Sequence, residues 1–128
     1  MTQTVFPVVY RDGANYKTYG TLVAEGAMTD AEHDLLKKSL DAGEMYLPLQ
    51  LGLEYYGTDW SGYNPDDYDH PWHEMLVDEI TIEDPERDFN WFNTPHVEYL
   101  GPVSEFVRAV AAAAAAGWDE SRYAPDAS

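Results

Sequence analysis

The placement of negative charge along this chain constrains what it can form more than any other feature of the sequence. Residues 54–98, which we call the acidic segment, contain 13 Asp and Glu but only one basic residue, Arg87, and so carry a net charge of −12. The rest of the chain contributes −5 to the total of −17. Like charges this concentrated repel one another and destabilise a compact state. The acidic segment therefore either serves a compensating use or is tolerated because carboxylates keep a protein soluble.

This charge excludes several classes of partner. Direct binding of nucleic acid needs clustered Lys and Arg, and the chain has 7 of these against 24 Asp and Glu. The same balance disfavours docking on an anionic membrane, and no apolar run approaches the roughly 20 residues of a membrane-spanning helix. The absence of cysteine and of a secretory signal pattern at the N-terminus favours a cytoplasmic protein.

The first part of the chain has a clear β pattern. β-Branched and aromatic residues fill positions 5–10, where Pro7 indicates an edge position or the start of a strand. Asp12 and Gly13 favour a turn, and alternation resumes over 16–24. We therefore expect a β-hairpin whose connection is longer than two residues.

A capping box marks the start of the first predicted helix. Thr29 is placed to accept a hydrogen bond from the backbone of Glu32, whose carboxylate can reach back to the Thr29 N–H. An apolar stripe follows at helical spacing, and Gly43 is a suitable end. The pattern predicts a helix over 29–42.

The second predicted helix covers residues 102–116. Pro102 suits the first helical position, and Gly117 suits the end, with Trp118 folding back against the last turn. The alanine run 111–116 favours close packing of this helix on a sheet over a dimer interface.

Weaker alternation predicts further strands over 45–51 and 75–82 and a short one over 95–100, whereas 54–73 resembles a loop. In the first of these strands Met45, Leu47, Leu49 and Leu51 form the apolar face. Together the elements predict a single α+β domain over residues 1–118, with a small antiparallel sheet packed by the two helices. Residues 119–128 are expected to form a flexible tail.

Within the acidic segment, carboxylates alternate with large aromatic residues. Trp and Tyr are the commonest energetic anchors of protein interfaces, and carboxylates around them steer a basic partner. These residues predict a partner-binding surface that comprises Asp59, Trp60, Tyr63, Asp66, Asp67, Tyr68, Asp69, Trp72 and Glu74. The expected partner is a basic protein surface, such as that of a nucleic-acid-binding protein. The sequence thus predicts a non-enzymatic inhibitor or binding module without a cofactor.

Two resemblances agree with this interpretation. In composition the chain is similar to the small DNA-mimic inhibitors that phages and mobile elements use against restriction or CRISPR machinery. In motif, residues 11–17, Gly20, the capped helix and the run 47–53 resemble a family of small acidic bacterial and phage-type proteins. The resemblance covers residues 5–53 and 70–74, and it implies no activity because none is assigned to that family.

Two alternatives remain open. Carboxylate and imidazole side chains suit a divalent metal, so His70 and His73 with the neighbouring carboxylates of 66–74 could serve a metal-binding protein or a metal-dependent hydrolase. The sequence from His73 begins like a HExxH zinc motif, but Val77 stands where the second His belongs. The other alternative is a soluble domain whose acidity has no partner-specific role.

Overall fold

The computed structural model describes residues 2–14, 16–58, 63, 69–83 and 96–125. Within these residues the chain forms, in order, β1 (Gln3–Arg11), β2 (Lys17–Glu25), α1 (Asp30–Ser39), β3 (Met45–Tyr46), η1 (Pro48–Leu51), η2 (Tyr56–Thr58), β4 (His73–Met75), η4 (Val77–Glu79), β5 (Thr81–Glu83), β6 (His96–Pro102), α2 (Val103–Ala116) and α3 (Glu120–Tyr123). The η elements are 3-10 helices.

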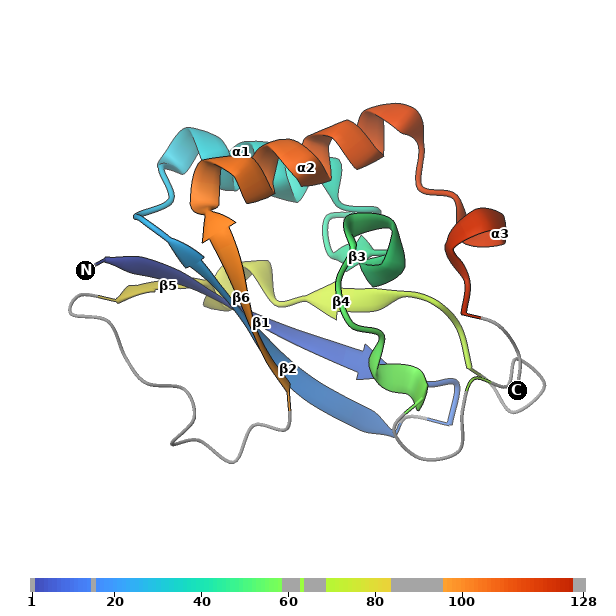
Figure 1. Ribbon diagram of the computed structural model, residues 1–128. Helices are drawn as coiled ribbons and strands as arrows, with labels where there is room; N and C mark the ends of the chain where they lie inside the picture. Colours follow the sequence, from blue (N-terminus) through green and yellow to red (C-terminus); the bar gives the residue numbers. More distant parts are fainter. Residues whose placement is uncertain (1, 15, 59–62, 64–68, 84–95, 126–128) are drawn as a thin grey trace.

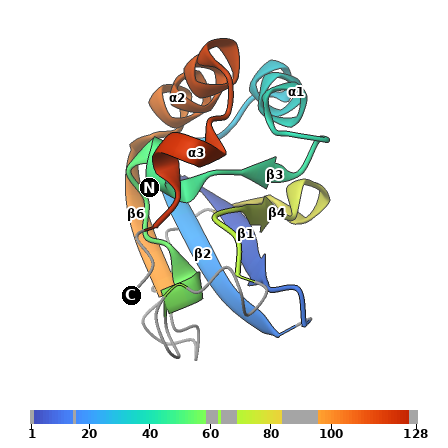
Figure 2. The same cartoon turned by 90° about the vertical axis from the view of Figure 1, so that its right-hand side faces the viewer.

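The sheet is built around the N-terminal hairpin. β1 and β2 pair antiparallel along their whole length, from Gln3 opposite Glu25 to Arg11 opposite Lys17. The order of neighbouring strands is β3-β4-β1-β2-β6, and β5 pairs with β1 beyond the end of β4. Helices α1 and α2 lie side by side over one face of this sheet (Figures 1 and 2). The predicted α+β fold with its hairpin and two main helices is confirmed.

The sheet is mixed, whereas the sequence predicted antiparallel pairing throughout. β6 pairs with β2 in parallel, with Gly20 opposite His96 and Val23 opposite Tyr99. The direction of β6 follows from its connection: it runs directly into α2, so it must point toward the helix layer, as the neighbouring end of β2 does (Figure 1).

Both helices agree closely with their predicted ends. The capping box of α1 is present: Thr29 Oγ1 accepts from the Glu32 N–H at 3.1 Å, and the Glu32 carboxylate accepts from the Thr29 N–H at 2.9 Å. α1 stops at Ser39, earlier than predicted, because Leu40 turns extended and is buried. α2 ends at Ala116 before Gly117, as predicted.

Two predicted strands are interrupted. The strand over 45–51 is confined to two residues, because Pro48 lacks an N–H for the ladder and begins η1 instead. Tyr46, which the alternation placed on the polar face, is 1% exposed. The strand over 75–82 is divided into β4 and β5 by the turn η4, where Leu76 N–H donates to the Pro7 carbonyl at 2.9 Å.

The main core lies between the sheet and the helix layer. Phe6 of β1 meets Phe106 of α2 edge to face, with ring centroids 5.2 Å apart, and Leu22 and Val107 are fully buried nearby. Ala113, in the alanine run, is buried, so this part of α2 packs against the rest of the domain. The Trp118 indole N–H donates to the Ser39 carbonyl of α1 at 3.0 Å, so this side chain contacts the neighbouring helix.

Candidate functional site

The predicted partner-binding surface is only partly within the described structure. Four of its residues are described, and they are Tyr63, Asp69, Trp72 and Glu74. The other five lie outside the described residues, and they are Asp59, Trp60, Asp66, Asp67 and Tyr68. The predicted surface as a whole therefore stays a prediction, and the described members show how its flanks are held.

Tyr63 is packed into the interior. It is 8% exposed, and its ring meets that of Tyr55 edge to face at 5.8 Å between centroids. Burial raises the pKa of its hydroxyl, with smaller contributions from Glu120 and Asp69. Tyr63 therefore packs among the aromatic residues that cover the sheet.

Trp72 lies beside the C-terminal segment. Its indole N–H donates to Glu120 Oε2 at 2.7 Å, and its ring is 6.3 Å from that of Trp118. Gln50 anchors the same segment, because its side-chain carbonyl accepts from the Asp119 N–H at 3.0 Å. Glu120 thus joins the carboxylates around Trp72 although the two residues are 48 positions apart in sequence.

The segment predicted to be a flexible tail begins with a short helix. Asp119 is the N-cap of α3, and its carboxylate accepts from the Ser121 hydroxyl at 2.6 Å and from the Arg122 N–H at 3.3 Å. These hydrogen bonds, led by that of Ser121, lower the pKa of the Asp119 carboxyl. Asp is among the preferred N-cap residues, so Asp119 is itself the sequence signal for such a cap. Flexibility of the remaining tail stays a prediction.

Glu74 and Asp69 are each held from the hairpin. Arg11 lies 3.8 Å from the Glu74 carboxylate, and the Tyr10 hydroxyl donates to Asp69 at 2.7 Å. Glu74 pairs with Val9 in the sheet register, so its side chain lies on the face opposite the helices. The middle of the acidic segment is therefore fixed to β1 by two polar contacts.

A cluster of aromatic and imidazole rings lies where the acidic segment meets the sheet. We call it the histidine–tyrosine cluster; its members are Tyr10, Tyr46, Tyr55, Tyr56, His70, His73 and His96. His73 is at its centre and is 1% exposed. Its ring lies 4.4 Å from that of Tyr56, stacks on that of Tyr55 at 5.5 Å and meets that of Tyr46 edge to face at 5.7 Å.

Main-chain hydrogen bonds define the protonation of two of these histidines. His73 Nε2 accepts from the Tyr56 N–H at 3.2 Å, and His73 Nδ1 is buried without a partner. His70 Nδ1 accepts from the Trp72 N–H at 3.2 Å, and its Nε2 lies 2.6 Å from the Arg11 carbonyl. A ring nitrogen that accepts carries no proton, so both imidazoles are neutral in this arrangement.

Burial shifts the titration of the cluster. It lowers the pKa of His73 from 6.5 to about 3, with further lowering by His70 and His96. It also raises the pKa of Tyr10 to about 12, and those of Tyr46 and Tyr55 well above the ordinary value. Burial therefore favours the uncharged forms of His73, Tyr10, Tyr46 and Tyr55.

The described residues do not assemble a metal site. Both ring nitrogens of His70 contact the main chain, and His73 is enclosed by tyrosine rings. In the described part of the chain no three His, Asp or Glu side chains are grouped so that they could hold a metal ion. Asp66 and Asp67, which the metal-binding alternative includes, lie outside the described residues, so that alternative stays a hypothesis.

Two further carboxylates of the acidic segment meet beside the cluster. The Glu54 N–H donates to the Glu98 carboxylate at 3.2 Å, and Glu54 lies 3.1 Å from His96 Nδ1. Burial, and secondarily the charge of Glu54, raises the pKa of Glu98. The His96 ring stacks on that of Tyr56 at 4.1 Å.

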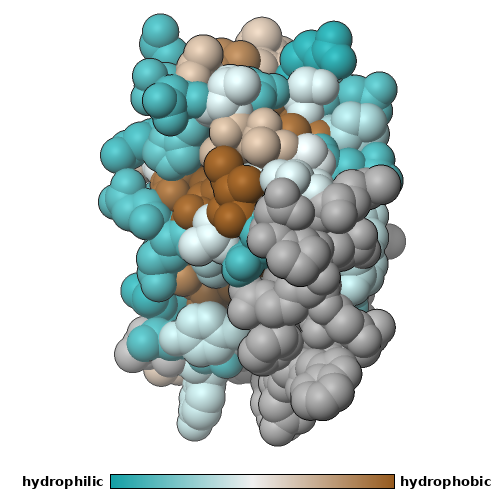
Figure 3. Space-filling model, turned by 90° about the vertical axis from the view of Figure 1, so that its left-hand side faces the viewer, coloured by the Kyte–Doolittle hydropathy of each residue, from teal (hydrophilic) through white to brown (hydrophobic). Residues whose placement is uncertain are grey.

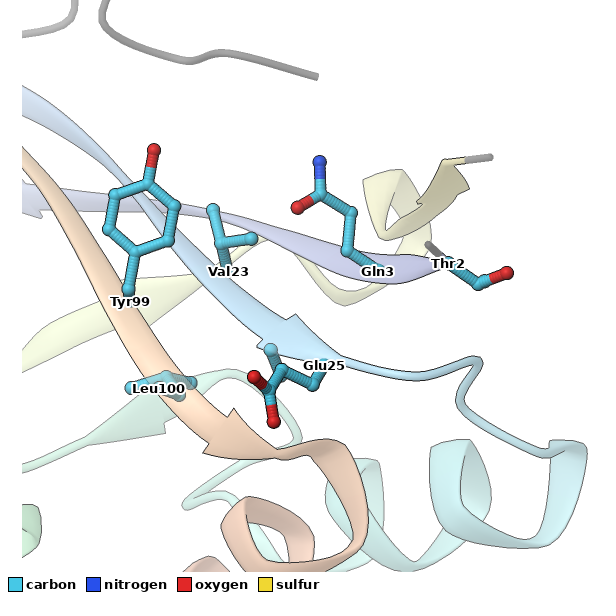
Figure 4. A pocket seen from close by; sticks show the side chains of 7 residues that line it. Thr2, Gln3, Val23, Glu25, Tyr99 and Leu100 are labelled. Atoms are coloured by element: carbon cyan, nitrogen blue, oxygen red, sulfur yellow. The ribbon is translucent and has the colours of Figure 1, made fainter. Parts of the chain in front are cut away.

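The other surface features of the described structure are modest. A cavity of about 100 Å³ lies where β1 begins and β2 and β6 end, and Tyr99, Val23 and Gln3 line it from one side (Figure 4). It is smaller than the ~300 Å³ of typical ligand pockets. Hydrophobic side chains also gather on the side of the molecule where the N-terminus and β5 lie (Figure 3), where Ile82 is half exposed.

Comparisons with known proteins found no matching family model, curated protein or solved structure. The resemblance to small acidic bacterial and phage-type proteins therefore stays a prediction. Among the helices described here, none is both long and apolar enough to cross a bilayer.

Proposed function

We propose that the protein is a non-enzymatic binding module that presents its acidic segment to a basic protein surface, and that it inhibits a nucleic-acid-binding protein by occupying the surface that would hold the nucleic acid. Duplex DNA carries one negative charge per ~1.7 Å of its axis, so a dense carboxylate array can compete for the same groove.

The observation that supports this proposal most is the length and exposure of the ion pairs that the described part of the acidic segment makes with Lys and Arg. The described carboxylates of this segment are Glu54, Asp69, Glu74, Asp78, Glu79, Glu83 and Glu98. Arg11 approaches Glu74, and Lys37 approaches Asp78, both at 3.8 Å; the second pair is largely exposed. Exposed pairs at this distance neutralise little of the field that a charged partner meets.

The packing of the C-terminal segment adds to the same surface. α3 brings Glu120 to Trp72, so a carboxylate and an indole lie in direct contact at 2.7 Å. Trp72 is half-buried, which leaves part of its ring for a partner. An aromatic ring bordered by carboxylates suits the Arg and Lys side chains of a nucleic-acid-binding surface, since it offers cation–π as well as ionic contact.

Competition with DNA tests the proposal directly. Proteins of a bacterial lysate that bind duplex DNA on a solid support are incubated with increasing amounts of this protein. We expect specific proteins to be released from the DNA, and the release to fall steeply between low and physiological salt. Failure to release any of them at a large excess of the protein would contradict the inhibitor function.

A pair of variants with equal charge separates a localised surface from general acidity. The first converts Asp59, Asp66, Asp67, Asp69 and Glu74 to the corresponding amides. The second converts five exposed carboxylates elsewhere, and these are Glu25, Asp34, Asp41, Glu44 and Glu105. Both variants change the net charge of −17 by the same five units. We expect only the first to lose competition; equal loss in both would show that the acidity has no localised role.

A further inference from the structure

The histidine–tyrosine cluster anchors two stretches of the acidic segment to the sheet. On one side the Tyr56 N–H donates to His73 Nε2, and on the other the Trp72 N–H donates to His70 Nδ1, each at 3.2 Å. Protonation of either nitrogen would place two N–H groups against each other in place of a donor and an acceptor. Both anchors therefore require neutral imidazoles.

We propose that this cluster is an acid-sensitive switch: at mildly acidic pH, protonation of His73 breaks its bond to the Tyr56 N–H and loosens residues 54–56 and 70–73 from the sheet, while the β1–β2 hairpin and the two long helices stay folded. The switch does not depend on what the acidic segment binds. If the switch fails its test, the proposed function is unaffected. If the proposed function fails its test, the switch is unaffected.

The groups that face His73 come from every element packed against it. They are Tyr10 of β1, Tyr46 of β3, Tyr55 and Tyr56 at the start of η2, His70 before β4 and His96 of β6. The neighbouring carboxylates are Asp69, bonded to Tyr10, and Glu54 and Glu98 beside His96. Glu54 favours positive charge on His96, and positive charge on His96 or His70 opposes a further proton on His73.

Opening of this region takes up protons. Burial, and then His70 and His96, hold the pKa of His73 at about 3 against its ordinary 6.5. When residues 54–56 and 70–73 separate from the sheet, the imidazole meets water and its pKa returns toward the ordinary value. The open form then binds a proton that the closed form does not, so a fall in pH favours opening.

The response is local because the anchored elements are short. β3 has 2 residues and β4 has 3, whereas the hairpin strands have 9 each. Leu22 and Val23 of β2 are buried, and their backbone pairing lies within this long hairpin. Short elements that depend on side-chain anchors open at lower free energy than a long paired hairpin.

Amide hydrogen exchange measured by NMR between pH 7 and pH 5 tests the switch in the unmodified protein. With a His73 pKa of 6.5 when open and about 3 when closed, the protection factors of the Tyr56 and Trp72 amides should fall about 25-fold over this range. The Leu22 and Val23 amides lie in the long hairpin, so they should remain more strongly protected than the Tyr56 and Trp72 amides at both pH values. Constant protection at Tyr56 and Trp72, or protection at Leu22 and Val23 no higher than theirs, would overturn the proposal.

Two matched variants identify the titrating group. His73→Gln keeps an acceptor for the Tyr56 N–H but cannot titrate, so the pH dependence at Tyr56 should disappear. His33→Gln is the control, because His33 Nε2 lies 3.1 Å from the Val77 carbonyl and can donate to it in either protonation state. It should keep the wild-type profile. If His73→Gln does not fold, the wild-type exchange profile alone decides.

Discussion

A single methyl group at Gly20 should destabilise the protein, because Tyr56 occupies the space beside that glycine. A Cβ built on Gly20 would lie 2.1 Å from the Tyr56 hydroxyl oxygen and 2.5 and 2.6 Å from two ring carbons. Tyr56 is 1% exposed, and the rings of His73 and His96 hold it from two sides at 4.4 and 4.1 Å. A shift of the tyrosine would therefore disturb both of these ring contacts.

The cost of Gly20→Ala follows from these distances. Carbon atoms pack best at about 3.5–4.0 Å, so the ring would have to shift by roughly 1 Å. Overpacking of this kind costs about 1–3 kcal/mol. Gly20 is not among the residues with a left-handed backbone, so alanine can adopt its conformation. In a strand, alanine is more favourable than glycine by roughly 0.5–1 kcal/mol in the free energy of unfolding, which offsets part of this cost. We expect a net loss of about 1–2 kcal/mol in the free energy of unfolding.

Urea denaturation followed by circular dichroism measures this loss as a lower midpoint at unchanged slope. Gly101→Ala is the matched control, because the nearest atom to its added Cβ is Glu105 Oε2 at an ordinary 3.7 Å. In a Tyr56→Leu background the contacting atoms are absent, so Gly20→Ala should cost little. A Gly20→Ala variant as stable as Gly101→Ala, or an equal loss in both backgrounds, would refute the reasoning.

Three further outcomes are expected. Thr29→Ala should lower the free energy of unfolding by about 1 kcal/mol through loss of the α1 cap, and Thr29→Ser should not; equal stability of both in urea would contradict the cap. Because the folded protein binds fewer protons at His73 than the unfolded chain, stability is complete above pH 6.5 and declines toward pH 3. Between pH 7 and 5 the decline should be about 2 kcal/mol in wild type relative to His73→Gln, and parallel pH profiles of the two would contradict it. Burial raises the pKa of Tyr10 to about 12, so its hydroxyl contributes little tyrosinate absorbance up to pH 11. Tyr10→Phe should therefore leave the absorbance of the protein unchanged over that range.

Local signals accounted for the elements that were predicted well. The capping box of α1 joins Thr29 and Glu32, which are three positions apart, and Gly117 ends α2 through its own backbone. The hairpin also follows from neighbouring residues, since its two strands are joined by one short turn. Contacts of this kind depend on nearby side chains and differ little with the rest of the fold.

The errors arose where distant parts of the chain meet. Pro48 and the turn at 77–79 interrupted two predicted strands, and β6 took a direction that only the position of α2 decides. Tyr46 is buried because His73 and the other cluster rings cover it, which no alternation of polar and apolar residues within 45–51 reveals.

The amino-acid sequence by itself determined the charge of this protein, the excess of carboxylates in residues 54–98, and the helices and hairpin that neighbouring residues specify. Only the tertiary structure decided that Tyr10 meets Asp69, 59 positions away, that Glu120 meets Trp72, and that four tyrosines enclose His73. Charge is a sum over residues and needs no fold, whereas burial and protonation depend on which distant groups the sheet brings into contact.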